Sequence, residues 1–374
     1  MMKYLKLALL FALTASFGTV PLRAQAPESP YQEARKIIAD LNRIVTPNGV
    51  QESLTVELGG TRQWVTIRGT DREHPILLFV HGGPAAPETP FLWAFQRPWE
   101  DFFTVVQWDQ RAAGKSWPLN EPGELVPDMK LERYVDDAIE LIEFLRQRFG
   151  KRKIILLGHS WGSAVGMTVA RKRPDLLHAY VGAGQIINAR RGEAASYDWT
   201  LEKAREAENA GAIRELEALA PYPAPGPFDV TAMTTQRKWN IRFGGLYGNR
   251  SDVSQYFKLP RLSPEYEPED IKSWGKGSDF SIRHLWPVIS EVNFDEVRRL
   301  DVPVYMFNGR HDYTTPAPLA ADWLRQVNAP KKANIWFEHS AHLMMISEPG
   351  RMLQALLKHA RPLAVEAGDG EPID

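Results

Sequence analysis

The sequence of 374 residues contains no cysteine. Thiol catalysis, thiolate-bound metal sites, disulfide bonds and lipid attachment to an N-terminal cysteine are therefore excluded. A chain of this length can bury a large core, so its stability does not require disulfide bonds even in an oxidising compartment.

Positive charge is not in excess either. The chain has 45 Lys and Arg against 46 Asp and Glu, a formal net charge of −1, and 44% hydrophobic residues. The hydrophobic fraction is that of an ordinary globular protein. Proteins that bind nucleic acids carry a basic patch or stripe, and this composition does not indicate one. No nucleic-acid partner is expected.

The N-terminal region lacks a hydrophobic run long enough to cross a membrane comfortably. Leu7–Phe17 is mainly apolar, follows the positive residues Lys3 and Lys6, and precedes the small residues around Ala24–Ala26. This order is typical of a secretory signal peptide. We expect residues 1–24 to be removed on export to the periplasm or the medium, with no stable membrane insertion afterwards. The alternative is an uncleaved N-terminal anchor.

Short apolar runs rich in β-forming residues recur along the chain. They lie at Ile76–Val80, Thr104–Trp108, Ile154–Leu157, Ala179–Val181, Val302–Phe307 and Asn334–Glu338. Such runs are typical of strands buried on both faces of a parallel sheet. Between them, Leu131–Phe149 repeats apolar residues at helical spacing, and Gly150 follows as a stop signal. The alternation predicts an α/β fold with a mostly parallel, doubly wound sheet.

Two elements precede these runs, and one long segment interrupts them. Tyr31–Val45 has the pattern of an amphipathic helix, while Ser53–Leu58 and Gln63–Arg68 predict an antiparallel hairpin. From about residue 186 to residue 295 the alternation stops, and the prolines of Pro221–Pro227 exclude regular structure there. We expect residues 186–295 to form a helical lid inserted into an α/β-hydrolase core.

The expected division of the chain follows from this segment. The core comprises residues 25–185 and 296–360, on either side of the lid. Residues 361–374 are acidic and are expected to form a frayed tail.

The motif Gly158-His159-Ser160-Trp161-Gly162 fits the pattern G-x-S-x-G, with a predicted strand before it and a helix of small residues after it. In this context the turn is so tight that only glycine fits at its ends, and the serine hydroxyl projects above the sheet at a helix N-terminus. Ser160 is therefore the candidate nucleophile.

A serine hydroxyl becomes a good nucleophile only when a base accepts its proton and an acid orients that base. This fold predicts the order Ser, Asp or Glu, His. Asp312 and His342 each follow a predicted strand, where an open α/β sheet gathers its site. His339 is the rival base, but it directly abuts the strand. A metal shared by the two histidines would lack a third ligand, so neither a metal nor a cofactor is expected.

The segment His81-Gly82-Gly83-Pro84 directly follows the strand predicted at Ile76–Val80. Consecutive glycines let backbone N–H groups approach a substrate oxygen without interference from side chains. Such a loop supplies one oxyanion donor, and the residue after the nucleophile supplies the other. We expect the N–H groups of Gly83 and Trp161 to be these donors, with Gly82 also contacting the substrate.

Five ordered motifs resemble those of the proline iminopeptidase branch of the α/β hydrolases, over about residues 50–360. They are HGGP at 81–84, DQRAAGKS at 109–116, GHSWGS at 158–163, GRHD at 309–312 and SAH at 340–342. Members of this branch typically read HGGPG, DQRG and GGSWG. This chain departs from them at Ala85, Ala112 and His159.

The resemblance implies a cofactor-free enzyme that releases an N-terminal proline from small peptides or amides. It also implies structural roles for Asp109 and Arg111, and a lid glutamate that holds the free amine of the substrate. Glu193 is the candidate for this glutamate, because a buried carboxylate would discriminate strongly for an ammonium group.

The sequence leaves other functions open. A carboxylesterase would use the same three residues on small neutral esters, since a fold does not fix a substrate. A lid that neutralises an ammonium group favours the peptidase, and a wholly apolar lid pocket favours the esterase. A non-catalytic binding protein on the same scaffold is a more distant alternative, because it would not require the nucleophile, base, acid and oxyanion loop together.

Overall fold

One sheet of eight strands, in the order β1-β2-β4-β3-β5-β6-β7-β8, forms the centre of the computed structural model, which describes residues 30–248 and 250–372. The strands are β1 (Val50–Leu58), β2 (Thr61–Gly69), β3 (Ile76–Val80), β4 (Thr104–Asp109), β5 (Ile154–His159), β6 (Leu177–Ala183), β7 (Val304–Gly309) and β8 (Lys332–Phe337). β2 is antiparallel to both β1 and β4, and all other neighbours are parallel. The signal peptide predicted at residues 1–24 lies outside the described residues and stays a prediction.

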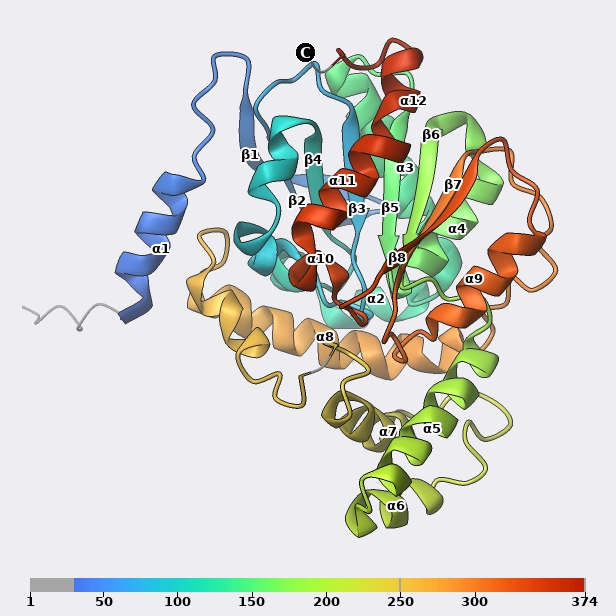
Figure 1. Cartoon of the computed structure of the whole chain (residues 1–374). Helices are drawn as coiled ribbons and strands as arrows, with labels where there is room; N and C mark the ends of the chain where they lie inside the picture. The colour runs from blue at the N-terminus through green and yellow to red at the C-terminus, as the bar shows by residue number, and fades with distance from the viewer. Residues whose placement is uncertain (1–29, 249, 373–374) are drawn as a thin grey trace, which may run out of the picture.

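Helices connect most of the strands (Figure 1). The α-helices are α1 (Pro30–Leu41), α2 (Pro122–Leu125), α3 (Leu131–Phe149), α4 (Trp161–Lys172), α5 (Ala189–Glu206), α6 (Ala210–Glu217), α7 (Val230–Arg242), α8 (Pro268–Ile289), α9 (Ala317–Gln326), α10 (Met344–Ser347), α11 (Pro349–His359) and α12 (Arg361–Glu366). Short 3₁₀ helices are η1 (Thr89–Ala94), η2 (Arg97–Asp101), η3 (Gly114–Leu119), η4 (Val126–Asp128), η5 (Pro174–Leu176) and η6 (Tyr256–Leu262). In the part of the chain that the structure describes, a helix both long and apolar enough to cross a bilayer is not found.

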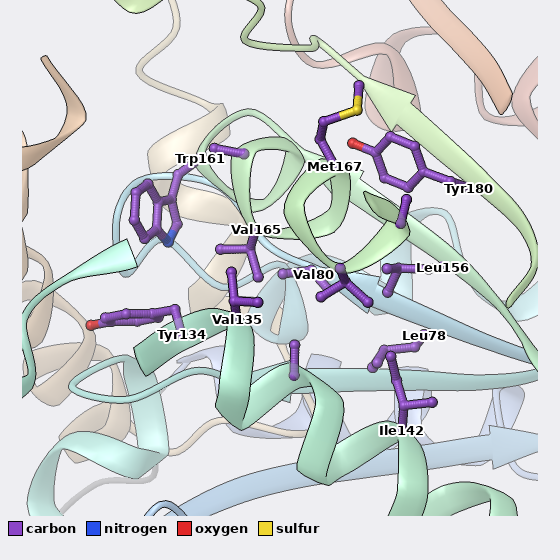
Figure 2. Close-up of a cluster of buried hydrophobic side chains, with 14 of the residues drawn as sticks. Leu78, Val80, Tyr134, Val135, Ile142, Leu156, Trp161, Val165, Met167 and Tyr180 are labelled. Carbon is purple, nitrogen blue, oxygen red and sulfur yellow. The ribbon is translucent and has the colours of Figure 1, made fainter. Parts of the chain in front are cut away.

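The sheet is buried on both faces, as the apolar runs predict. Every residue of β3, β4, β5, β6 and β7 is buried. Helices α3, α4 and α9 pack on one face, and η1, η2, α11 and α12 cover the other. Figure 2 shows part of the first layer, where Val135 of α3 and Val165 of α4 lie close to Val80 of β3. The predicted fold class, a mostly parallel doubly wound sheet, is confirmed.

The local predictions hold best where the pattern is long. Helix α3 has the predicted bounds, and Gly150 ends it with a left-handed φ of 64°. The predicted hairpin forms as β1 and β2. The N-terminal helix is shorter than predicted, because α1 ends at Leu41. Just past its end, the buried guanidinium of Arg68 donates to the carbonyl oxygen of Asn42, a long-range contact that the local pattern does not indicate.

Helices α5 to α8 occupy the chain between β6 and β7, and Figure 1 shows them gathered below the sheet, with α8 crossing directly beneath it. The proline-rich stretch between α6 and α7 is irregular, as predicted. Two contacts tie these helices to the loop after β7. The Trp199 ring stacks on Tyr313 at a centroid distance of 4.4 Å, and the Asn240 side chain donates to the Tyr313 carbonyl at 3.0 Å.

The prediction of a frayed C-terminal tail is wrong. Residues 361–366 form α12, and Asp369 beyond it is buried. The Asp369 carboxylate accepts hydrogen bonds from the backbone N–H groups of Arg152 and Lys153, at 3.1 to 3.2 Å, and contacts the His178 ring at 2.8 Å. Burial opposes ionisation of Asp369, but these three partners together hold the pKa of its carboxyl below the usual value. The acidic composition of the tail predicts fraying and does not indicate that one of its carboxylates binds the backbone of Arg152 and Lys153.

We expect Asp369→Ala to lower the free energy of unfolding by about 2 kcal/mol, because two backbone donors and a buried histidine lose their acceptor. Urea denaturation of the variant and the wild type measures this. Glu371→Ala, which changes an exposed side chain nearby, is the matched control and should have an effect close to zero. Equal stability of Asp369→Ala and wild type would contradict the docked tail.

Candidate active site

Ser160 lies in the tight turn between β5 and α4. Its φ of 53° is in the left-handed region, which is strained for a residue other than glycine. A Cβ at Gly162 would overlap the carbonyl oxygen of Val80 in β3, and a Cβ at Gly158 would overlap the carbonyl oxygen of Gly162. Glycine is therefore required at both ends of the motif, because the strand, the turn and the helix are in direct backbone contact.

Asp312 and His342 come from the loops after β7 and β8. The Nδ1 of His342 donates to Oδ2 of Asp312 at 2.9 Å. The other carboxylate oxygen accepts the backbone N–H groups of Thr314 and Thr315, each at 2.9 Å. Both Asp312 and His342 are buried, whereas His339 is exposed on the surface. Of the two histidines considered as the base, the structure brings only His342 to the aspartate.

A cavity of about 350 Å³ lies between the carboxyl ends of the strands and helices α5, α7 and α8. Ser160 and His342 both line it. Most of the remaining lining is apolar and comes from the helical segment and its flanks. It includes Ile186, Met233, Ile241, Trp274, Ile282, Trp286 and Leu319.

The glycine loop after β3 lies against the serine. A Cβ at Gly82 would lie 2.9 Å from the Cβ of Ser160, and Gly82 and Gly83 both line the cavity. Trp161 is the first residue of α4, so its N–H has no acceptor within the helix. The positions predicted as oxyanion donors thus border the same space as Ser160.

The side chain of Trp161 anchors this region from behind. Its indole N–H donates to the side chain of Gln110 at 3.1 Å, and Gln110 in turn donates to the carbonyl oxygen of His81 at 2.9 Å. Figure 2 shows the indole above Tyr134 of α3, and the two rings meet edge to face at 5.4 Å. The glycine loop and the first turn of α4 are consequently held together.

His159 connects the serine turn to the histidine loop. Its Nδ1 lies 2.8 Å from Oε1 of Glu88, and its Nε2 lies 3.0 Å from the carbonyl oxygen of His342. The rings of His159 and His342 are 4.7 Å apart. Both ring nitrogens of His159 face oxygen atoms. The two contacts therefore require either a protonated ring beside an ionised Glu88 or a neutral ring that accepts the proton of Glu88, and in both states the pair has no net charge.

Glu193 is buried on α5 and lines the cavity, but its carboxylate is already paired. Its Oε1 forms an ion pair with the guanidinium of Arg237, and its Oε2 accepts the hydroxyl of Tyr222 at 2.5 Å. Arg237 lines the cavity as well. The predicted amine-binding glutamate therefore has a cation from α7 beside it, which the sequence pattern did not reveal.

Asp109 and Arg111 are buried away from the cavity lining. Asp109 accepts hydrogen bonds from Thr89 at 2.6 Å, from the backbone N–H of Lys115 at 2.8 Å and from the Tyr266 hydroxyl. Burial raises the pKa of Asp109 to about 6, against these hydrogen bonds. Arg111 donates to both oxygens of Asp137 in α3, at 3.0 and 3.1 Å. Both residues fix loops beside the site.

Burial lowers the pKa of His342 below its usual value. Asp312 acts in the opposite direction, while the charges of His159 and Arg237 add to the effect of burial. His342 therefore stays neutral, and able to accept a proton, at a pH lower than an exposed histidine would. Among the described residues, a group of three or more His, Asp or Glu side chains that would suit a metal ion is not present.

The family model described as alpha/beta hydrolase fold matches residues 75–349 of this sequence. The chain belongs to the α/β-hydrolase family. Its curated relatives include a probable aminopeptidase of Bacillus subtilis (strain 168), 31% identical over 82% of this chain and 95% of the relative. A proline iminopeptidase of Saccharolobus solfataricus is 22% identical over 78% of this chain and 85% of the relative.

Solved structures share the fold of this hydrolase. The proline iminopeptidase-related protein of Thermus thermophilus has a TM-score of 0.59 and 20% identity, covering 84% of this chain and 99% of that chain. The proline iminopeptidase of Mycobacterium smegmatis has a TM-score of 0.57 and 17% identity, covering 84% and 100%. The structures show the shared fold, and the curated relatives place the hydrolase in the proline iminopeptidase-like branch of the family.

Sequence reasoning missed two charged residues of the hydrolase site, Glu88 and Arg237. Glu88 lies in the loop after the glycine motif, and Arg237 is one of several basic residues of α7. Neither belongs to a motif. One local signal was present. This chain has His159 where the branch usually has glycine, and a buried histidine beside Ser160 needs an acidic or carbonyl partner.

We expect Gly162→Ala to destabilise the hydrolase by about 3 kcal/mol or more, because the added methyl group would overlap backbone atoms of Val80 and His81, which cannot turn away. Thermal or urea unfolding tests this. Gly123→Ala is the matched control, since nothing lies within 4 Å of a Cβ there and its φ is ordinary. A Gly162→Ala variant as stable as the control would contradict the backbone contact.

Proposed function

We propose that the protein is a serine hydrolase that acts through an acyl-serine intermediate, and that its preferred substrates are small peptides or amides with a free N-terminal amine. Ser160 is the nucleophile, His342 the general base and Asp312 the group that orients it. The observation that carries the proposal is the hydrogen bond between His342 and Asp312 beside a strained serine turn, with Ser160 and His342 on one cavity.

The proposed reaction follows from these positions. His342 accepts the proton of the Ser160 hydroxyl as the oxygen attacks the substrate carbonyl carbon, and Asp312 stabilises the imidazolium. The N–H groups of Trp161 and Gly83 donate to the oxyanion of the tetrahedral intermediate, beside Gly82. His342 then gives the proton to the leaving amine. Water, activated by the same imidazole, hydrolyses the acyl-serine and restores the enzyme.

The charge of the site supports a cationic substrate. Glu88 and Glu193 line the cavity and Asp312 lies behind His342, against one guanidinium, that of Arg237. Glu193 is paired with Arg237, whereas Glu88 contacts its partner His159 through one oxygen only. Because buried charge is costly unless it is paired, a carboxylate on the cavity wall favours a substrate that brings an ammonium group. The name of the Bacillus relative, a probable aminopeptidase, agrees with this preference.

A second candidate function is a carboxylesterase on small neutral esters. The apolar lining from α7 and α8 favours it, because such a surface binds neutral acyl chains without requiring a charge. In that case Glu88 and Glu193 would both act only through their partners within the protein, His159 and Arg237.

Substrate choice separates the two functions. We expect kcat/KM to be higher for prolyl p-nitroanilide than for N-acetyl-prolyl p-nitroanilide, because acetylation removes the ammonium group that a carboxylate of the cavity wall would bind. Alanyl p-nitroanilide and p-nitrophenyl butyrate complete the set. Ser160→Ala should reduce every rate at least about 10⁴-fold and abolish labelling by a fluorophosphonate. Turnover of the ester alone would contradict the peptidase, and an unlabelled wild type would contradict the serine mechanism.

The acid limb of the pH profile should lie below the ordinary histidine pKa of about 6.5. Burial lowers the pKa of His342, and the base must be neutral to accept a proton. Activity is therefore retained below pH 6.5 and lost as the pH falls through the lowered pKa. The measurement is kcat/KM for p-nitrophenyl butyrate from pH 4 to 9, because this substrate has no ionising amine. An acid limb at or above the ordinary value would contradict the assignment.

A further inference from the structure

Two buried carboxylates line the cavity, and only one of them has a free oxygen. Both oxygens of Glu193 are occupied, by Arg237 and by Tyr222. Glu88 contacts His159 through Oε1, but its Oε2 has no hydrogen-bond partner among the described residues. The Glu88 side chain is 8% exposed. Glu88 lines the cavity, and a buried carboxylate oxygen without a donor is costly, so a ligand in the cavity is the candidate donor.

The position of Glu88 suits the amine of an aminopeptidase substrate. In such a substrate the nitrogen is two bonds from the carbonyl carbon that Ser160 attacks, so its partner must lie close to the nucleophile. A Cβ at Gly82 would lie 2.9 Å from the Cβ of Ser160 and 3.2 Å from Nδ1 of His159, and that nitrogen lies 2.8 Å from Glu88. Only the ring of His159 thus lies between Glu88 and the glycine loop beside Ser160.

Aromatic residues line the cavity together with Glu88. Tyr256 and Trp274 line the cavity with Glu88, and Phe91 holds them both. Phe91 stacks on Tyr256 at 4.7 Å with an angle of 6° between the rings, and meets the Trp274 ring edge to face at 5.8 Å. Burial, and then the charge of Glu88, raise the pKa of the Tyr256 hydroxyl, which agrees with the nearness of the two side chains. Aromatic rings beside a carboxylate favour organic cations.

We propose that Glu88, with the rings of Tyr256 and Trp274, binds the ammonium group of the substrate, and that Glu193 does not. This inference rests on the proposed aminopeptidase function and names the residue that selects the free amine. A pyrrolidinium group fits the subsite well, because it brings two N–H donors for the carboxylate and methylene groups for the aromatic rings. Glu193, paired with Arg237, holds α5 to α7 beside this subsite.

The test compares two isosteric variants, Glu88→Gln and Glu193→Gln. The readout is the ratio of kcat/KM for prolyl p-nitroanilide to kcat/KM for p-nitrophenyl butyrate, so that a general loss of activity cancels. We expect Glu88→Gln to lower this ratio at least about tenfold, mainly through KM, since a charge-assisted hydrogen bond is lost. Glu88→Asp should keep more of the ratio than Glu88→Gln. An unchanged ratio in Glu88→Gln, or the larger loss in Glu193→Gln, overturns the inference.

A second measurement does not depend on peptidase activity or on the folding of a variant. Pyrrolidine hydrochloride and the neutral ring compound cyclopentanol are compared as competitive inhibitors of p-nitrophenyl butyrate hydrolysis by the wild type. We expect the pyrrolidinium ion to inhibit at least about tenfold more strongly. Equal inhibition by the two compounds overturns the ammonium subsite. Selective inhibition by pyrrolidinium without turnover of any free-amine anilide would instead support the subsite and contradict the proposed peptidase function.

Discussion

The backbone contact between β3 and the first turn of α4 is the constraint on which the site depends. Without side chains at Gly158 and Gly162, the strand, the turn and the helix approach closely enough to force Ser160 into a left-handed conformation. The same contact brings the glycine loop after β3 against the serine and leaves the first N–H of α4 free. The proposed nucleophile and both proposed oxyanion donors are thus positioned by one backbone contact in the centre of the sheet.

Charge pairing shapes the rest of the cavity. Asp312, Glu193 and Glu88 each have a specific partner, and each partner ties together elements that are distant in the sequence. Glu193 joins α5 to α7 through Arg237, while His159 joins the loop of Glu88 to the backbone of His342. These pairs hold helices α5 and α7 and the loops at the strand ends in fixed positions. They also decide which acceptor remains available to a substrate, because an oxygen that is already bonded inside the protein offers little to a ligand.

Local patterns predicted most of the core. The apolar runs predict the parallel strands because strands buried on both faces need continuous apolar residues. Both ends of α3 are predicted correctly because its apolar stripe is long and is followed by glycine. Prediction failed where a long-range contact decided the structure. Arg68 binds the backbone just past the end of α1, where the pattern predicted more helix, and Asp369 docks the acidic tail on the backbone of Arg152 and Lys153. Neither partner can be read from the neighbouring sequence.

The sequence by itself determined the fold class, the serine turn and the order of Ser160, Asp312 and His342, because glycine spacing and strand-ending motifs are local requirements of the backbone. Only the tertiary structure decided the electrostatics of the cavity. It placed Arg237 against Glu193 and His159 against Glu88, and so left a free oxygen on the glutamate that no motif marks. The reason is physical: the cost of a buried charge depends on partners that folding brings from elsewhere in the chain.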